Sequence, residues 1–263
     1  MVNRPTIHTA WLPALSVLLL GGVFAITEVC KRPGAERLVI PERESVIRSW
    51  EYVDGFAEKI AVFQTVFWEP RDTNSLRELI ETTDLVRGKT VLEIGTGSGL
   101  VSLCCLRAGA ARVVATDVNP NALENANYNA HVLGVADRLE TRLVPTGSPS
   151  AYGVLGPGER YDVIVSNPPW ENARPRTIDE YALYDRDFQL LRSILSGARS
   201  RLNPGGRLLL AYGCRDAIET LEQLAASHHF RAQRLDERLL ADLPEVFIPG
   251  MLVELLPQIG RHP

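Results

Sequence analysis

From residue 90 onward, short apolar runs alternate with longer amphipathic stretches, and this pattern predicts strands that are followed by helices. Seven runs are rich in β-branched or large apolar residues and are bounded by turn residues. They are residues 90–94, 111–117, 138–144, 161–166, 207–213, 230–237 and 250–257. Amphipathic helices are expected at 100–109, 119–134, 177–202 and 215–228. Such alternation predicts an α/β fold with a seven-stranded, mostly parallel sheet, helices on both faces and an antiparallel last strand.

The first thirty residues have a different pattern. Residues 11–26 read WLPALSVLLLGGVFAI, and no charged residue lies between Arg4 and Glu28. A membrane-spanning helix needs about 20 apolar residues, so this stretch is at the short limit. It fits a membrane anchor, a signal peptide cleaved after Ala25, or an N-terminal apolar helix packed on the domain. Lys and Arg are more frequent in 31–37 than in the first four residues, which favours one anchor with the rest of the chain in the cytoplasm.

The chain is therefore expected to have three parts. They are an apolar N-terminal segment at 1–30, a connecting segment at 31–65 and a main domain at 66–263. Within the connecting segment, residues 44–63 have a partly helical spacing of apolar positions and are expected to pack on the main domain.

Composition narrows the classes of partner and cofactor. The formal net charge is −4, so the chain has no overall basic field for nucleic acid. The spacing of the four cysteines matches no metal or disulfide framework. Cys104 and Cys105 are adjacent in a predicted helix, which indicates buried small apolar residues. No bound metal is expected.

Candidate chemistry follows three of the predicted strands. Strand 90–94 runs into the glycine-rich stretch GTGSG at 95–99, strand 111–117 ends in Asp117, and strand 161–166 runs into SNPPW at 166–170. In an open α/β sheet, ligands bind beyond the carboxyl ends of the strands. Three marked strand ends in this order therefore predict one binding site, although each motif alone could be a structural turn.

The glycine spacing distinguishes between classes of cofactor. Gly95, Gly97 and Gly99 form G-x-G-x-G, and Leu100 stands where the dinucleotide fingerprint G-x-G-x-x-G has its last glycine. The carboxylate of Glu93, just before the loop, repels a pyrophosphate and suits a cationic ligand. Asp117, about twenty residues past the glycines, is placed to accept from two ribose hydroxyls. A cationic nucleoside points to S-adenosylmethionine as the cofactor.

The corner after strand 161–166 has the groups needed to hold a nitrogen nucleophile. The side-chain oxygen of Asn167 and the carbonyl of Pro168 can accept two N–H groups. Both prolines fix φ near −65°, so the corner is rigid, and Pro169 has no N–H. The indole of Trp170 can stack on a planar substrate group. The alternative is a strand-terminating turn with a packing tryptophan.

The stretches VLEIGTGSG, ATDVNPNALENANYNA and YDVIVSNPPW resemble the class I S-adenosylmethionine-dependent methyltransferases, which have a Rossmann-like fold. The Asn-Pro-Pro-aromatic corner narrows the resemblance to nitrogen methylators of the HemK type, which methylate a glutamine side-chain amide of peptide release factors. Residues 66–79, VFWEPRDTNSLREL, resemble the Pro-x-x-Thr segment of that family. The resemblance covers about residues 62–215. It implies catalytic roles for Asn167, Pro168, Pro169 and Trp170, and cofactor-binding roles for Thr73, Glu93, Gly95, Thr96, Gly97, Gly99, Asp117 and Val118.

Some features depart from the family pattern. Trp170 replaces the usual Tyr or Phe, and LVPTGSPS at 143–150 lacks the acidic or aromatic residue that often contacts adenine. A hydrophobic segment stands where bacterial release-factor enzymes have a helical substrate domain. Asp72 or Thr73 could also be only the N-cap of a surface helix, with Arg71 beside it.

These departures affect the expected substrate more than the expected reaction. The leading partner is a protein whose side-chain amide or amine is methylated. The alternatives are a small-molecule or nucleobase N-methyltransferase, a non-catalytic module that binds S-adenosylmethionine, and an NAD-dependent oxidoreductase. Leu100 and the missing dinucleotide fingerprint disfavour the last of these.

Overall fold

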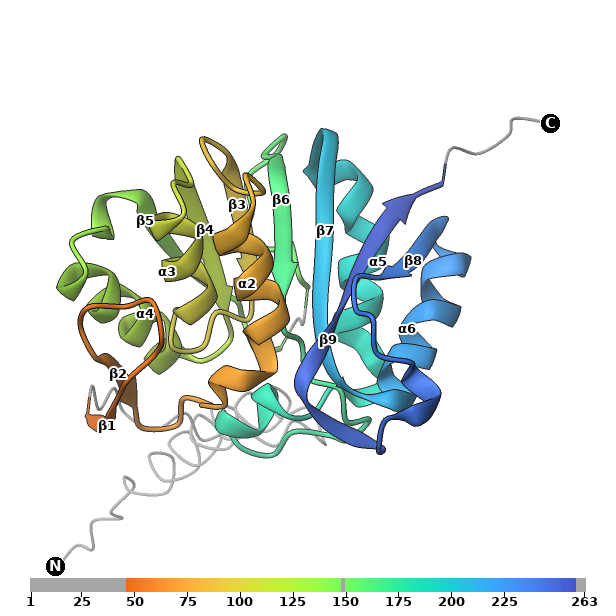
Figure 1. Ribbon diagram of the computed structural model, residues 1–263, viewed down its shortest axis with the longest axis horizontal. Coiled ribbons are helices and arrows are strands. Elements are labelled where there is room, and N and C mark those ends of the chain that lie inside the picture. The colour runs from red at the N-terminus through yellow and green to blue at the C-terminus, as the bar shows by residue number, and fades with distance from the viewer. Residues whose placement is uncertain (1–45, 148–149, 259–263) are drawn as a thin grey trace, which may run out of the picture. The chain divides into compact units, whose positions relative to one another are not determined.

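A computed structural model of the chain describes residues 46–147 and 150–258. Its centre is a seven-stranded sheet in the order β5-β4-β3-β6-β7-β9-β8 (Figure 1). The strands are β3 (Thr90–Ile94), β4 (Arg112–Asp117), β5 (Leu139–Leu143), β6 (Tyr161–Ser166), β7 (Leu202–Cys214), β8 (Phe230–Arg234) and β9 (Val246–Pro257). The first five of these strands pair in parallel, and β9 lies antiparallel between β7 and β8. The predicted Rossmann-like sheet with an antiparallel last strand is confirmed.

Helices cover both faces of the sheet because alternate strand residues point to opposite sides. Val91 packs with α2 (Asn74–Thr82), α3 (Leu100–Arg107) and part of α4 (Pro120–Val132). Leu92, its neighbour in β3, packs with α5 (Gln189–Arg201) and α6 (Arg215–Ser227) on the other face. The central strands are therefore buried on both sides, as expected of a parallel sheet. Cys104 and Cys105 are buried in the first of these clusters, as predicted.

The predicted long helix at 177–202 is wrong in its first half. α5 begins only at Gln189, after two 3₁₀ turns, η3 (Asp179–Ala182) and η4 (Arg186–Phe188). Asp187 and Phe188 have positive φ angles of 55° and 52°, which a continuous right-handed helix does not allow. The buried carboxylate of Asp185 instead accepts the backbone N–H groups of the first turn of α5, at 2.9 and 3.1 Å. The amphipathic spacing continued past the true helix start and concealed it.

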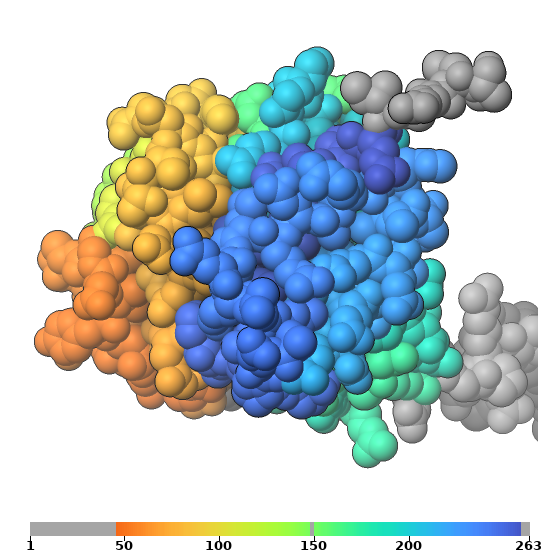
Figure 2. Space-filling view, turned by 45° about the vertical axis from the view of Figure 1, so that its right-hand side comes forward, coloured from red at the N-terminus to blue at the C-terminus, as the bar shows by residue number. Residues whose placement is uncertain are grey.

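The partly helical expectation for residues 44–63 is also wrong. β1 (Ile47–Glu51) and β2 (Ile60–Phe63) form an antiparallel hairpin, which is orange in Figure 1 and forms one flank of the surface in Figure 2. Residues at alternate positions of β1 are more exposed, as in a half-buried strand. The Asp54–Gly55 pair in the connecting loop, with Gly55 at a φ of 86°, is a common hairpin signal.

The side-chain amides of two asparagines in α4 form hydrogen bonds with the backbone of β2, as the backbone of a neighbouring strand would. Asn125 accepts the N–H of Phe63 at 2.8 Å and donates to the carbonyl of Ala61 at 2.8 Å. Asn129 accepts the N–H of Ala61 at 2.9 Å and also donates to the carbonyl of Ser98 at 3.0 Å. Because these backbone groups are buried, the two amides satisfy them where no strand could. They link the hairpin, α4 and the glycine loop.

Several element ends differ from prediction by a few residues, and the differences at β7 and β9 are larger. β7 includes the NPGG stretch, where its pairing with β6 shifts register and Gly205 has a φ of 76°. β9 begins at Val246 rather than at residue 250. Residues 1–45, which hold the predicted N-terminal apolar helix, lie outside the described residues. Within the described ranges, no helix has the length and apolar character that a membrane span requires.

Candidate functional site

Strand register brings the three marked strand ends together. β3 pairs with β4 on one side and with β6 on the other, and Ile94 lies level with both Thr116 and Ser166. The glycine loop, Asp117 and Asn167 each follow directly after this row. Backbone hydrogen bonds also join the glycine loop to β4, because the N–H groups of Gly95 and Thr96 donate to the carbonyl of Thr116 at 2.8 and 3.0 Å. The three marked strand ends therefore lie side by side at one edge of the sheet.

The three loop positions are occupied by glycine for different structural reasons. All have positive φ, at 77°, 54° and 85° for Gly95, Gly97 and Gly99. A Cβ on Gly95 or Gly97 would meet open space, so these positions leave room beside the backbone. A Cβ on Gly99 would lie 2.8 Å from the backbone of Ala126 in α4. The first two glycines therefore border the space of the site, and Gly99 permits the close packing of α3 on α4.

The buried carboxylate of Glu93 holds the glycine loop in place through hydrogen bonds. Its side chain is buried, and its Oε2 accepts from the Thr96 hydroxyl at 2.7 Å and from the Ser102 backbone N–H at 3.1 Å. The Ser102 hydroxyl also donates to Oε2. Burial raises the pKa of Glu93 to about 7, while the bonds from Ser102 and Thr96 oppose the rise. One carboxylate thus joins the end of β3, the loop and the first turn of α3.

Asp117 joins the second strand to the same loop. Its Oδ2 accepts the backbone N–H of Gly97 at 2.9 Å, and its Oδ1 accepts that of Asn119 at 2.8 Å. Burial raises the pKa of Asp117, and these backbone bonds, with one from Val118, act in the opposite direction. The carboxylate is therefore fixed at the mouth of the loop. Asn119 is the N-cap of α4, since its side chain accepts the N–H of Asn121 at 3.0 Å.

The Asn-Pro-Pro corner presents an unused acceptor. Asn167 Oδ1 is buried and has no hydrogen-bond partner among the described residues. Pro168 and Pro169 are buried behind it. Buried polar atoms in native proteins are normally paired, so this acceptor at a strand end is a candidate contact for a ligand. It can accept an N–H or an O–H group.

Trp170 is partly packed against the core, which agrees with the alternative interpretation of the corner as a strand-terminating turn with a packing tryptophan. A Cβ added to Gly213 of β7 would lie 3.0 Å from the tip of the indole, and Trp170 packs against the core formed with α5 and α6. The ring is only half-buried. The missing side chain at Gly213 therefore makes space for the indole, and stacking on a substrate stays a prediction.

The upstream turn also reaches the site. η1 (Pro70–Thr73) lies against β7 and β9, and the carbonyl oxygen of Asp72 lies 2.6 Å from the position of a Cβ on Gly250. Thr73 occupies the N-cap position of α2 without a side-chain capping bond, and its hydroxyl donates to the carbonyl of Pro70 at 3.3 Å. Arg71 is paired with Glu69 at 2.8 Å on the exposed side of the turn. These contacts leave the cofactor role of Thr73 as a prediction.

Asp72 is a buried carboxylate beside this turn that sequence reasoning missed. The side chain is only 2% exposed, and its Oδ1 has no hydrogen-bond partner among the described residues. Burial and the charge of Glu69 raise the pKa of Asp72 to about 6, while Arg71 and Asn167 oppose the rise. An acidic residue before a predicted helix indicated a cap, and nothing in the sequence indicated that this carboxylate is buried.

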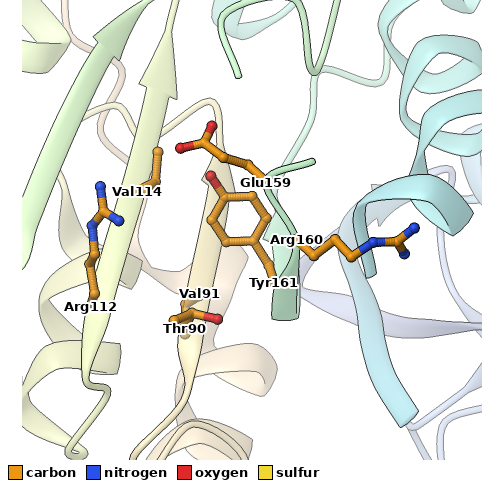
Figure 3. Close-up of a pocket in the computed structure, with 7 residues that line it drawn as sticks. All are labelled: Thr90, Val91, Arg112, Val114, Glu159, Arg160 and Tyr161. Carbon is orange, nitrogen blue, oxygen red and sulfur yellow. The ribbon is translucent and has the colours of Figure 1, made fainter. Parts of the chain in front are cut away.

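A small pocket lies at the opposite edge of the sheet (Figure 3). It is lined by the first residues of β3, β4 and β6, namely Thr90, Arg112 and Tyr161, together with Val91, Val114, Glu159 and Arg160. Glu159 is ion-paired with Arg142 at 2.6 Å, which holds the pKa of Glu159 at about 2. The amino ends of parallel strands are not where this fold binds its ligands. We therefore assign the site to the opposite edge.

The chain is similar to known protein methyltransferases. The family model for ribosomal protein L11 methyltransferase (PrmA) matches residues 73–168. The chain is 40% identical over 136 residues to a release factor glutamine methyltransferase of Cereibacter sphaeroides, covering 47% of this chain and 46% of that protein. It is 36% identical over 95 residues to the ribosomal protein L11 methyltransferase of Escherichia coli, covering 36% of this chain and 29% of that protein. The chain thus spans half or less of the length of these relatives.

A solved structure agrees with the fold. The S-adenosylmethionine-dependent methyltransferase of Agrobacterium tumefaciens superposes with a TM-score of 0.55 at 19% identity, over 83% of this chain and 72% of that one. At this identity the likeness concerns the fold alone. The sequence matches confirm the resemblance of this chain to the HemK-like, S-adenosylmethionine-dependent methyltransferases.

Proposed function

We propose that this protein transfers a methyl group from S-adenosylmethionine to a nitrogen of a protein, with a glutamine side-chain amide as the leading acceptor. The observation that carries the proposal is the buried, unpartnered Oδ1 of Asn167, one strand away from the open glycines of the loop. An acceptor in this position can hold an N–H donor. The similarity to proteins named release factor glutamine methyltransferase supports an amide N–H₂ group as that donor.

The residues around the glycine loop fit a nucleoside with a cationic sulfur. Open space beside Gly95 and Gly97 lets a ligand approach the backbone, with Thr96 between them. Asp117 is held by Gly97 and Asn119, and a carboxylate can accept further bonds from ribose hydroxyls. Glu93 supplies a buried carboxylate behind the loop. In this proposal Thr73, Gly99 and Val118 complete the cofactor side of the site.

The Asn-Pro-Pro corner acts by holding the nucleophile. S-adenosylmethionine supplies an electrophilic methyl group bonded to a sulfonium. An amide nitrogen is a poor nucleophile because its lone pair is delocalised into the carbonyl group. Asn167 Oδ1 and the Pro168 carbonyl accept its two N–H groups, which fixes the nitrogen and favours localisation of the lone pair. Correct orientation of this kind lowers barriers by roughly 7–11 kcal/mol. Pro168 and Pro169 keep the corner rigid, and Trp170 forms its wall.

Replacement of Asn167 by alanine tests this role. The Asn167→Ala variant should lose methyl transfer by at least about 100-fold, and its affinity for S-adenosylhomocysteine in calorimetry should be nearly unchanged. Asn203→Ala is a matched control, because Asn203 contacts Asp162 at the opposite edge of the sheet. Near-wild-type turnover by Asn167→Ala would remove the corner from the mechanism.

A second candidate is a small-molecule or nucleobase N-methyltransferase that uses the same corner, and a third is a binding module without transfer. The half-buried Trp170 gives a planar acceptor a surface to stack on, which keeps the second open. The net charge of −4 disfavours a nucleic-acid duplex. Labelling of a cell extract with radioactive S-adenosylmethionine separates the candidates. The proposal expects label in the protein fraction, whereas label confined to small molecules or nucleic acid would contradict it.

We further propose the division of the chain into residues 1–30, 31–65 and 66–263, with residues 11–26 as one membrane anchor and the catalytic domain on the cytoplasmic side. The support is the apolar composition of 11–26 and the basic residues that follow it. Membrane fractionation of the full chain, compared with a chain starting near Gly34, tests the anchor. Equal solubility of the two would contradict it.

A further inference from the structure

Thr65, just after the β1-β2 hairpin, has a backbone conformation that is rare for its residue type. Its φ angle is 62°, in the left-handed region, where a β-branched side chain is strained. In the part of the chain that the structure describes, Thr65 is the only β-branched residue with a positive φ. Strain of this kind persists only where surrounding contacts hold the residue in place. The partners of Thr65 therefore show what this conformation achieves.

Two asparagines at the start of α4 bond to Thr65. The side-chain N–H₂ group of Asn119 donates to the Thr65 carbonyl at 2.9 Å and to the Thr65 hydroxyl at 3.3 Å. The N–H₂ group of Asn121 donates to the same hydroxyl at 3.0 Å. Both asparagines are buried. The carbonyl and the hydroxyl of Thr65 are thus both directed to the first turn of α4, more than fifty residues later in the chain.

Asn119 connects Thr65 to the carboxylate of Asp117. The Asn119 side chain is held at both ends, because its Oδ1 accepts the N–H of Asn121 at 3.0 Å while its N–H₂ group donates to Thr65. The backbone N–H of Asn119 donates to Oδ1 of Asp117 at 2.8 Å. Because the side chain is fixed, the direction of this backbone N–H is fixed as well. A continuous chain of hydrogen bonds therefore runs from the end of the hairpin to Asp117.

We propose that Thr65 is a positioning residue that holds the Asp117 carboxylate, through Asn119, in the orientation that binds the ribose of S-adenosylmethionine. A carboxylate that is oriented before binding loses less conformational freedom when the ligand arrives, so the affinity is higher. The bonds of Thr65 are not needed merely to attach the hairpin, because Asn125 and Asn129 already bond to β2 further along α4. This inference rests on the proposed ribose role of Asp117.

Matched variants test the positioning role through the affinity for S-adenosylhomocysteine, measured by calorimetry on protein whose folding is checked by circular dichroism. Thr65→Val keeps the size and branching of the side chain but removes the hydroxyl, and it should weaken binding on the order of 3- to 10-fold. Thr65→Ser keeps the hydroxyl and should bind as the wild type does.

A second variant approaches the same link from α4. Asn119→Ser keeps a good N-cap residue but removes the N–H₂ group that bonds to Thr65, so it should also weaken binding by roughly 3- to 10-fold. Gln64→Ala is the control, because the Gln64 side chain is exposed, and it should leave the affinity unchanged. Wild-type affinity in Thr65→Val and Asn119→Ser would overturn the inference.

A double-mutant cycle separates positioning from support of the fold alone. Because Thr65 acts through Asp117, Thr65→Val should weaken the binding of S-adenosylhomocysteine in the wild-type background, and by less than about 2-fold when Asp117 is already alanine. An equal loss in both backgrounds would show that Thr65 only supports the fold, and would overturn the inference while leaving the ribose role intact. Unchanged affinity in Asp117→Ala itself would instead refute the ribose role and, with it, the inference that rests on that role.

Discussion

The carboxylate of Asp117 accepts the backbone N–H of Gly97 at 2.9 Å, and this bond ties the end of β4 to the glycine loop that follows β3. The bond spans twenty residues of sequence and fixes both the loop and the carboxylate. A second backbone bond, from Asn119 at 2.8 Å, fixes the other oxygen. The group proposed to bind ribose is therefore already oriented in the free protein, and its removal should affect the cofactor directly.

Asp117→Ala should weaken the binding of S-adenosylhomocysteine roughly 10- to 100-fold, because hydrogen bonds to a charged group contribute about 1.5–3 kcal/mol. Isothermal calorimetry measures the affinity. Asp137→Ala, at an exposed carboxylate in η2 (Ala136–Arg138), is the matched control and should leave it unchanged. Unaltered affinity in a folded Asp117→Ala protein would refute the ribose role.

Gly99→Ala should destabilise the fold more than it weakens the cofactor. The added methyl group would lie 2.8 Å from the backbone of Ala126, and the φ of 85° is strained for any side chain. We expect a loss of about 2–4 kcal/mol in the free energy of unfolding, measured with urea. Gly97→Ala is the matched comparison, because its Cβ would meet open space. It should cost about 1–2 kcal/mol from φ alone and weaken the cofactor more, and a reversed order would contradict the two assignments.

Asn129→Ala should reduce the free energy of unfolding by about 2–4 kcal/mol, since it removes the partner of the buried N–H of Ala61 and of the Ser98 carbonyl, and leaves the Ala61 carbonyl with the amide of Asn125 as its side-chain donor. Asn127, two positions earlier on the exposed face of α4, contacts only the hydroxyl of Thr141 among the described residues. Asn127→Ala should change stability by less than about 0.5 kcal/mol. Equal effects in the two urea titrations would show that the amides do not support the hairpin.

Asp72→Asn should stabilise the fold at high pH. The folded-state pKa of Asp72 is raised from its ordinary value to about 6, so the folded protein binds a proton more tightly than the unfolded chain does. The ionised carboxylate therefore reduces stability above about pH 6, by about 2–3 kcal/mol, and this penalty disappears as the pH falls toward about 4. Urea titrations at about pH 8 and pH 4 should show a gain for Asp72→Asn only at the higher pH. An equal gain at both would contradict the raised pKa.

The sheet and the site edge were predictable from sequence because each signal was local. Apolar runs fixed the strands, and the glycines, Asp117 and Asn167 each followed directly after one. The start of α5 was not predictable, because it depends on positive φ angles at Asp187 and Phe188 that the amphipathic spacing does not reveal.

Contacts between segments that are distant in the chain were also difficult to predict from the sequence. Asn121, Asn125 and Asn129 recur every four residues on one face of α4, and all three are buried. A polar stripe of this kind on a core-facing helix was a signal for partners elsewhere, here β2 and its flank. The burial of Asp72 had no such signal, because a single acidic residue before a helix is an ordinary cap.

The most direct test of the central claim is mass spectrometry of a purified bacterial release factor after incubation with this protein and S-adenosylmethionine. The account predicts that one glutamine of the release factor gains one methyl group on its side-chain nitrogen, and that Asn167→Ala, which still binds S-adenosylhomocysteine, adds none. Modification by the wild type at carbon or oxygen, or equal modification by Asn167→Ala, would contradict the account of a corner that holds an N–H₂ group.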